Sequence, residues 1–144
     1  MLYSPKMKDC IFCRIIKGEI PSAKVFEDKD TLAFLDVNPV SKGHCLVVPK
    51  KHFQDVFDIN SNDFQKIILA GKGLAKRLKE KLKADGVNLL QSNGKSAGQV
   101  IFHFHLHVIP RYNDDGLRTH GLFGEKSESR SVEELKKLAE EINS

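Results

Sequence analysis

Three histidines alternate with apolar residues in the segment FHFHLHVIPRY, residues 102–112. His103, His105 and His107 hold every second position, and this strict alternation is typical of a half-buried strand. Successive side chains of a strand point to opposite faces, so the three imidazoles share one face at a spacing of roughly 6.6 Å. The strand is expected to end at Ile109–Pro110, because proline cannot donate to a central ladder. The residues expected to face a core on the opposite side are Phe102, Phe104, Leu106 and Val108.

Three histidines in register favour a functional site over an ordinary exposed strand face. Two chemistries use several imidazoles together: metal ligation, as in three-histidine zinc sites, and nucleophilic attack by one imidazole while its neighbours hold an anion. No carboxylate lies within the triplet to act as the base of a zinc hydrolase. Histidine is mostly neutral at pH 7 and can attack phosphorus without help. The preceding loop, SNGKSAGQV at 92–100, has glycines and small polar residues that let backbone N–H groups approach an anion.

The chain as a whole indicates one globular domain. Its 144 residues suit a single core, and a net charge of +4 with a pI of about 8.9 is compatible with a phosphate-bearing ligand but too weak to indicate nucleic acid. No segment approaches the roughly 20 apolar residues of a membrane span, and the N-terminus lacks the apolar run of a signal peptide. We therefore expect a cytoplasmic protein, in which the three cysteines are reduced thiols.

Apolar periodicity predicts an α+β fold with an antiparallel sheet. A short helix at 10–18 should end at a left-handed Gly18, and a long helix should cover 60–86, capped by Asn60 or Ser61 and ended by Gly86. A last helix at 131–142 begins with a capping box from Ser131 to Glu134. The predicted strands are 24–28 and 31–37 around a turn at 28–30, a buried strand from 44 to Pro49, 87–92, and the histidine strand. The apolar stripe of the long helix comprises Phe64, Ile67, Ile68, Gly71, Leu74, Ala75, Leu78 and Leu82, and Gly71 and Gly73 would allow close packing on the sheet.

The segment HFHLHVI at 103–109 fits the pattern His-φ-His-φ-His-φ-φ, in which φ is apolar, and resembles the signature of the histidine-triad (HIT) superfamily. The segment CIFCRIIKGEIPSAKVFEDKDTLAFLDVNPVSKGHCLVVPKKH is similar to that family's N-terminal half, and AGQ before the triad and IPRY after it resemble prokaryotic HIT hydrolases. The resemblance covers roughly residues 9–112 of a single domain over 1–144, with 113–144 as a C-terminal extension. It implies a HIT-like fold: an antiparallel sheet of about five strands, one long helix and a C-terminal helix.

The resemblance also implies a nucleotide hydrolase or nucleotidyl transferase that acts at an α-phosphate. His105 would be the nucleophile that forms a nucleotidyl-histidine, with His103 beside it in the triad. His107 would donate to the phosphate, and His44 would lie near it. Asp36 would bind the two ribose hydroxyls, a task for which a carboxylate is suited because it accepts from two donors at once.

The remaining nucleotide-binding residues implied by the resemblance lie in an apolar pocket and in the loop before the triad. Val100 stands where family members commonly have Ser or Thr, which removes one hydrogen-bond donor, although backbone N–H groups of Gln99 and Val100 can still serve. Of Ser92 and Asn93, we favour Asn93 as the amide that contacts phosphate. Some pocket residues can alternatively be plain core. The expected set is Ile11, Phe12, Ile15, Ile20, Phe34, Leu35, Val37, Asn93, Gly98, Gln99 and Val100.

Cys10 and Cys13 form a C-x-x-C pair, which alone is ambiguous between a redox pair, a metal half-site and chance. Within the superfamily, the uridylyltransferase branch and some prokaryotic HIT proteins are similar in having a structural zinc site. The resemblance implies the ligands Cys10, Cys13, His52 and His103. The alternative is that His52 is a surface histidine and that His103 hydrogen-bonds within the core. Cys45 is expected to be an inert core thiol.

Three functional hypotheses remain open. The leading one is hydrolysis of purine nucleoside phosphoramidates or dinucleoside polyphosphates through His105, by a homodimer of the kind the family implies. The second is a nucleotide-binding regulatory module with incidental hydrolysis. The third is a zinc hydrolase that uses the triad as metal ligands. The sequence leaves open the leaving group, the choice between adenosine and guanosine, and any role for His120.

Overall fold

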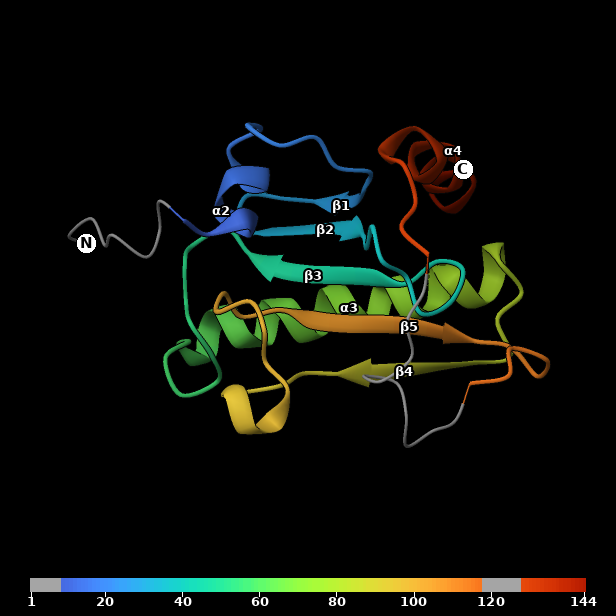
Figure 1. The fold of residues 1–144 in the computed structure, drawn as a ribbon. Coiled ribbons are helices and arrows are strands. Elements are labelled where there is room, and N and C mark those ends of the chain that lie inside the picture. Colours follow the sequence, from blue (N-terminus) through green and yellow to red (C-terminus); the bar gives the residue numbers. More distant parts are fainter. Residues whose placement is uncertain (1–8, 118–127) are drawn as a thin grey trace.

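The computed structural model of the protein describes residues 9–117 and 128–144. Five strands form one antiparallel sheet in the order β1-β2-β3-β5-β4 (Figure 1). With a long helix and a C-terminal helix, this confirms the predicted α+β fold. The strands are β1 Lys24–Glu27, β2 Thr31–Leu35, β3 Cys45–Pro49, β4 Gly86–Leu90 and β5 Leu106–Arg111; the helices are α2 Ile11–Ile16, α3 Ser61–Lys81 and α4 Val132–Asn143, with a 3-10 turn at Lys95–Ala97.

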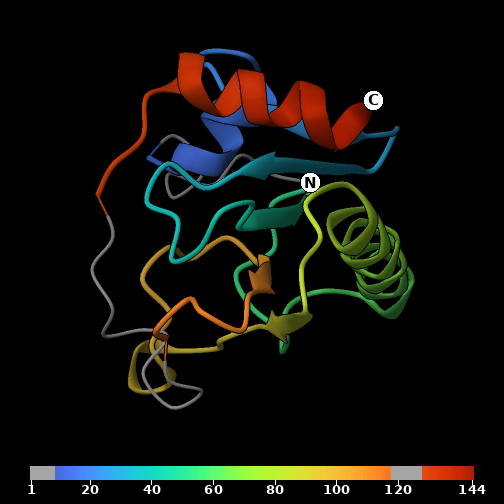
Figure 2. The same ribbon diagram turned by 90° about the vertical axis from the view of Figure 1, so that its right-hand side faces the viewer.

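The central strands β2 and β3 are buried on both faces, as their continuous apolar sequence predicts. One face packs against α3, and the other packs against the short helix α2; Figure 2 shows the two helices on opposite sides of the sheet. Each face of the sheet has its own apolar core, one under α3 and one under α2, and alternate residues of each strand pack into them. Ala33 and Val47 pack into the α3 core, whereas Phe34 and Leu46 pack into the α2 core. The α2 face also carries the histidines, so this side of the sheet holds the chemistry.

The ends of the helices follow local chemistry. Gly18 follows α2 with a φ of +80°, as predicted, and the Asn60 side chain accepts a hydrogen bond from the Asp63 N–H to cap α3. The prediction that α3 runs to Gly86 was wrong. Lys83 takes a left-handed conformation with a φ of +57°, which ends the helix after Lys81. Gly86 instead begins β4.

The histidine strand both begins and ends later than predicted, and it leaves out His103 and His105. β5 begins at Leu106 because its neighbour β3 pairs only as far as Val47, opposite Leu106. Phe102, expected in a core, is 41% exposed, whereas Phe104, Leu106 and Val108 are buried in the α3 core. The expected end at Ile109–Pro110 was wrong, because β5 runs to Arg111. Pro110 lies inside β5, beyond the part paired with β3, where it is paired only with β4. A missing N–H is tolerated there because no ladder is required on the β3 side.

The two glycines of α3 differ in their surroundings. A Cβ built on Gly71 would lie 2.6 Å from Cδ2 of Leu106, so the absence of a side chain lets the helix approach β5. A Cβ on Gly73 would meet nothing within 4 Å. The predicted close packing is therefore confirmed at Gly71 only. Ile68, placed on the apolar stripe from its spacing, is 38% exposed.

The C-terminal helix α4 docks beside β1 and α3 through Leu135, Ala139 and Ile142 (Figure 1). Ser131 caps it by accepting from the Glu134 N–H. Within the described part of the chain, no helix is both long and apolar enough to cross a membrane.

Candidate active site

The central histidine of the triad is held in one tautomer by the backbone. The Nδ1–H of His105 donates to the carbonyl oxygen of His103 at 2.7 Å, so the lone pair of the neutral ring lies on Nε2. The ring packs edge-on against Phe12, with centroids 5.2 Å apart, and beside His107, at 5.0 Å. Burial lowers the pKa of His105, which keeps the ring neutral and nucleophilic.

His107, the third histidine of the triad, takes the tautomer opposite to that of His105, and His44 determines it. His44 is buried, and its Nδ1 accepts from the Val40 N–H at 3.1 Å, which places its proton on Nε2. That Nε2–H donates to Nδ1 of His107 at 2.9 Å, so neutral His107 carries its proton on Nε2. Burial lowers the pKa of His44 and, reinforced by the neighbouring histidines, lowers that of His107 to about 3. Neighbouring triad rings thus present an acceptor on His105 and a donor on His107.

The first histidine belongs to a different cluster. His103 is fully buried, and its Nε2–H donates to the Pro49 carbonyl at 2.9 Å, which leaves Nδ1 as an acceptor. Nδ1 faces Cys10 Sγ at 3.3 Å, Cys13 Sγ at 3.5 Å and His52 Nδ1 at 3.1 Å. Cys13 Sγ lies 3.2 Å from His52 Nδ1. These four side chains form a group that could hold a metal ion.

The distances within this cluster fit a tetrahedral ion. Zinc–sulfur bonds of about 2.3 Å and zinc–nitrogen bonds of about 2.0–2.1 Å place sulfur and nitrogen about 3.6 Å apart and two nitrogens about 3.4 Å apart. A ligating imidazole normally donates its other N–H to a carbonyl or carboxylate, as His103 does to Pro49. Burial raises the pKa of Cys13 to about 12, so without a cation this thiol is protonated.

The triad does not converge on one metal. Among the described residues, the two groups able to hold an ion are the cysteine cluster, which takes His103, and a second group of Asp36, His44 and His107. His105 belongs to neither. This arrangement does not favour the hypothesis of a zinc hydrolase with three triad ligands.

A cavity of about 420 Å³ opens against His105 and His107 and continues between α2, β2 and α4. Asp36 follows β2 at the cavity wall, and its Oδ1 accepts from the Asn38 N–H at 2.9 Å. Its Oδ2 lies 3.7 Å from Nε2 of His44. The cavity thus joins a carboxylate to the histidines. The predicted pocket residues that line it are Ile11, Phe12, Ile15, Ile20, Phe34, Leu35, Val37, Gly98 and Val100.

Asn93 and Gln99, from the loop at 92–100 before the triad, do not line this cavity. Asn93 instead accepts from the Val56 N–H through Oδ1 at 2.7 Å, and its amide pairs with Gln91. Gln99 is buried, and its side chain binds the backbone of Gly94, Gln54 and Ile101. Its backbone N–H donates to the Gly94 carbonyl. The N–H expected to serve phosphate is thus engaged within the loop in this structure. Val100, by contrast, is 83% exposed at the cavity mouth.

Several lining residues were not anticipated from the sequence. Nothing in the sequence separates the apolar residues Ala23, Leu46 and Ile101 from core positions, and Pro21 and Ser22 carry no pattern that indicates a cavity. Val132 and Leu135 come from α4, and nothing in their helical spacing distinguishes a cavity wall from a core contact. His120 lies outside the described residues.

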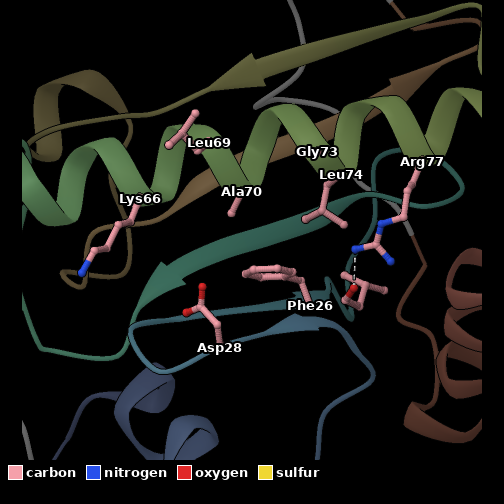
Figure 3. A pocket seen from close by; sticks show the side chains of 9 residues that line it. Phe26, Asp28, Lys66, Leu69, Ala70, Gly73, Leu74 and Arg77 are labelled. Carbon is pink, nitrogen blue, oxygen red and sulfur yellow. Dashed lines mark hydrogen bonds between the residues drawn. The ribbon is translucent and has the colours of Figure 1, made fainter.

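A larger hollow, of about 690 Å³, lies between β1 and α3 and is shown in Figure 3. It has apolar walls from Phe26, Leu69 and Leu74, with Lys66 and Asp28 towards one end and Arg77 at the other (Figure 3). Arg77 donates to the Val25 carbonyl, and Lys66 pairs with Asp30. No histidine or cysteine lines it. It therefore offers no nucleophile of the kind found in the histidine cavity.

Comparison with known proteins agrees with this geometry. A family model described as the HIT domain matches residues 17–114. The chain is 46% identical over 105 residues to the protein named hit of Bacillus subtilis, covering 73% of this chain and 72% of that protein. It is 40% identical over 136 residues to adenosine 5′-monophosphoramidase hnt1 of Schizosaccharomyces pombe, covering 94% and 96%.

A solved structure is similar to this chain over most of its length. A zinc-bound histidine triad family protein from Mycobacterium smegmatis has a TM-score of 0.81 and 34% identity, with 94% of each chain covered. The segment of this chain that the family model matches contains all three triad histidines, Asp36 and His44. The fold, the histidine cavity and these similarities together show that the chain belongs to the HIT family.

Proposed function

We propose that the protein is a nucleotide-binding hydrolase that cleaves purine nucleoside phosphoramidates or dinucleoside polyphosphates at the α-phosphate, through a nucleotidyl intermediate on His105. The observation that carries the proposal is the fixed tautomer of His105, whose Nδ1–H is engaged by the His103 carbonyl beside a cavity of nucleoside size. This arrangement presents Nε2 as the nucleophile. The name of the fission-yeast relative, adenosine 5′-monophosphoramidase, supports the phosphoramidate class.

The reaction has two displacements at phosphorus. A bond forms between His105 Nε2 and the α-phosphorus as the bond to the leaving group breaks. Water then attacks phosphorus, and the histidine–phosphorus bond breaks. For a phosphoramidate, the leaving amine takes up a proton in the first displacement. The water of the second displacement gives its hydroxyl to phosphorus and returns a proton, so the net result is the addition of one water molecule. The Nε2–H of His107, set by His44, donates to a phosphoryl oxygen as charge develops there.

Asp36 binds the ribose in this proposal. Its carboxylate lies on the cavity wall between the histidines and the apolar residues of α2 and β2, and it is oriented by the Asn38 N–H. A carboxylate accepts hydrogen bonds from two neighbouring hydroxyls at once. The base would lie against the apolar residues, chiefly Phe12, Ile15 and Phe34, which give contact area without hydrogen-bond readout.

Cys10, Cys13, His52 and His103 bind zinc in this proposal. The interatomic distances and the carbonyl partner of His103 support it, as does the zinc-bound relative from M. smegmatis. Bound zinc would supply a cross-link between α2 and the segment before β5. His103 would then have two separate tasks, since its ring is a ligand and its carbonyl orients His105. A homodimer that acts on a purine nucleotide in the cytoplasm completes the proposal.

The experiment is turnover of an adenosine phosphoramidate at neutral pH by wild type and His105→Ala, each with and without brief chelator exposure. We expect wild type to turn over, the variant to be slower by at least about a thousandfold, and brief chelation to leave activity intact.

Equal rates in the two proteins would contradict the nucleophile assignment. Immediate loss of all activity with chelator, while the fold is retained, would favour the zinc hydrolase. Nucleotide binding without turnover in wild type would favour the regulatory module.

A further inference from the structure

The C-terminal helix contributes to the nucleotide cavity. Val132 and Leu135 of α4 line the same cavity as Asp36 and His105, although they lie beyond the segment matched by the HIT family model. Leu135 is 5% exposed. Ala139 and Ile142 anchor the helix in the α3 core, and the Ser131 cap fixes its first turn. A docked and capped helix thus supplies part of the wall.

The segment that leads into α4 is bonded to the loop that carries Asp36. The Arg130 N–H donates to the Val37 carbonyl at 2.8 Å. The hydroxyl of Ser129 donates to Oδ1 of Asn38 at 2.7 Å, and the Asn38 N–H donates to Oδ1 of Asp36 at 2.9 Å. These contacts form a continuous chain from Ser129 to the carboxylate.

We propose that residues 129–135 determine nucleoside affinity and specificity: Val132 and Leu135 form an apolar wall of the nucleotide site, and Ser129 positions Asp36 for the ribose hydroxyls through Asn38. The inference rests on the proposed function, because it assigns the cavity to a nucleotide. It adds a specificity-determining element outside the family-matched segment. Ser129 acts as a positioning residue, since it reaches the ribose only through Asn38 and Asp36.

The wall is tested by filling the cavity from α4. Val132→Trp places an indole at a position that lines the same cavity as Asp36, whereas Lys136→Trp places the same group on an exposed position of the same helix. The measurement is the dissociation constant of AMP by titration calorimetry, with melting temperature as the check on folding. We expect at least about a tenfold weakening for Val132→Trp and wild-type affinity for Lys136→Trp. Wild-type affinity in folded Val132→Trp would overturn the wall assignment.

The positioning role is tested with a substitution at an exposed residue. Ser129→Ala removes one hydrogen bond, and Ser129→Thr keeps the hydroxyl. The readout is the ratio of affinities for AMP and 2′,3′-dideoxyadenosine monophosphate, which isolates the ribose hydroxyls. We expect Ser129→Ala to reduce the ratio about two- to tenfold, with KM raised and kcat unchanged. Ser129→Thr should retain the wild-type ratio, and Asp36→Asn should abolish the preference.

An unchanged ratio in Ser129→Ala would overturn the positioning role. The binding assays separate this inference from the proposed function. If wild type binds AMP without hydrolysing a phosphoramidate, the hydrolase proposal fails while the wall can still be confirmed by calorimetry. If wild type hydrolyses the substrate and both Val132→Trp and Ser129→Ala match it in affinity and ratio, only this inference fails. A wild-type protein that binds no AMP would overturn both.

Discussion

At the scale of single residues, the site depends on which ring nitrogen carries the proton. His105 and His107 are two positions apart and present opposite edges, because a carbonyl fixes the first ring and His44 fixes the second. Two residues of the same type therefore act differently: His105 presents a nucleophilic nitrogen, and His107 presents a hydrogen-bond donor. The backbone N–H of Val40 begins this chain, since it determines the tautomer of His44.

Replacing His44 should weaken catalysis without removing the nucleophile. In His44→Ala, Nδ1 of His107 loses its donor, so the ring can take either tautomer and the Nε2–H is no longer fixed. We expect kcat for an adenosine phosphoramidate to fall about tenfold, the equivalent of roughly one hydrogen bond at 1.4 kcal/mol. His105→Ala, in the same assay, should fall much further. An unchanged kcat in folded His44→Ala would contradict the tautomer chain.

Buried neutral histidines should make the fold sensitive to acid. The pKa values of His44 and His107 are lowered mainly by burial, that of His107 to about 3, against about 6.5 in the unfolded chain. Below pH 6.5 the unfolded state binds more protons than the folded state, so stability is full above pH 6.5 and falls as the pH drops from there. Each fully shifted histidine contributes a slope of about 1.4 kcal/mol per pH unit.

The measurement is urea denaturation between pH 7 and pH 4, comparing wild type with His107→Gln. We expect the variant to lose less stability over this range, because one of the titrating groups is gone. Parallel curves for the two proteins would show that His107 does not titrate on unfolding.

At the scale of elements, the sequence pattern predicted side-chain direction better than strand pairing. Alternation correctly placed Phe104, Leu106 and Val108 in the core. It failed at Phe102, which is 41% exposed where the chain bends at 101–103. It could not show that pairing with β3 stops at Val47, since that depends on the register of a distant strand.

The site residues also divide into those that the sequence predicted and those that it could not. The family resemblance named the triad, Asp36 and the cysteines, and the structure gathers them into two adjacent groups. It could not place Asn93 against Val56, because that contact joins two loops whose lengths alone do not fix their approach. Nor could helical periodicity separate Leu135, a cavity wall, from Ile142, a buried core residue.

The contact between α3 and β5 gives a matched pair of substitutions. Gly71→Ala forces a Cβ to within 2.6 Å of the buried Leu106 side chain, so we expect a loss of about 1–3 kcal/mol of stability. Gly73→Ala meets open space and should gain about 0.5–1 kcal/mol from helix propensity. Chemical denaturation measures both. A gain in both variants would show that α3 does not pack as closely on β5 as described.

At the scale of the whole molecule, the first and the last helix among the described residues, α2 and α4, both lie against the histidine cavity. α2 is attached to the segment before β5 through the cysteine cluster, and α4 is attached to the Asp36 loop through Ser129 and Arg130. The central sheet provides the histidines, and these two helices close the cavity around them.

Removal of the proposed zinc should therefore destabilise the fold more than it impairs the chemistry. We expect prolonged chelation to lower the melting temperature of wild type, because α2 loses its cross-link, and zinc to restore it. Cys13→Ser should start from the lower melting temperature and should not respond to chelator. A wild-type melting temperature that is indifferent to chelator, together with no zinc in the purified protein by elemental analysis, would contradict the metal site.

The central claim is that His105 becomes covalently bonded to phosphorus, and acid quenching during turnover of an adenosine phosphoramidate tests it most directly. The quenched protein is digested under conditions that preserve phosphorus–nitrogen bonds, and mass spectrometry locates any adenylyl group. The account predicts an adenylyl group on His105 in wild type at early times and none in His105→Ala. Turnover with no adduct at any time, or an adduct on another residue that persists in His105→Ala, would contradict it.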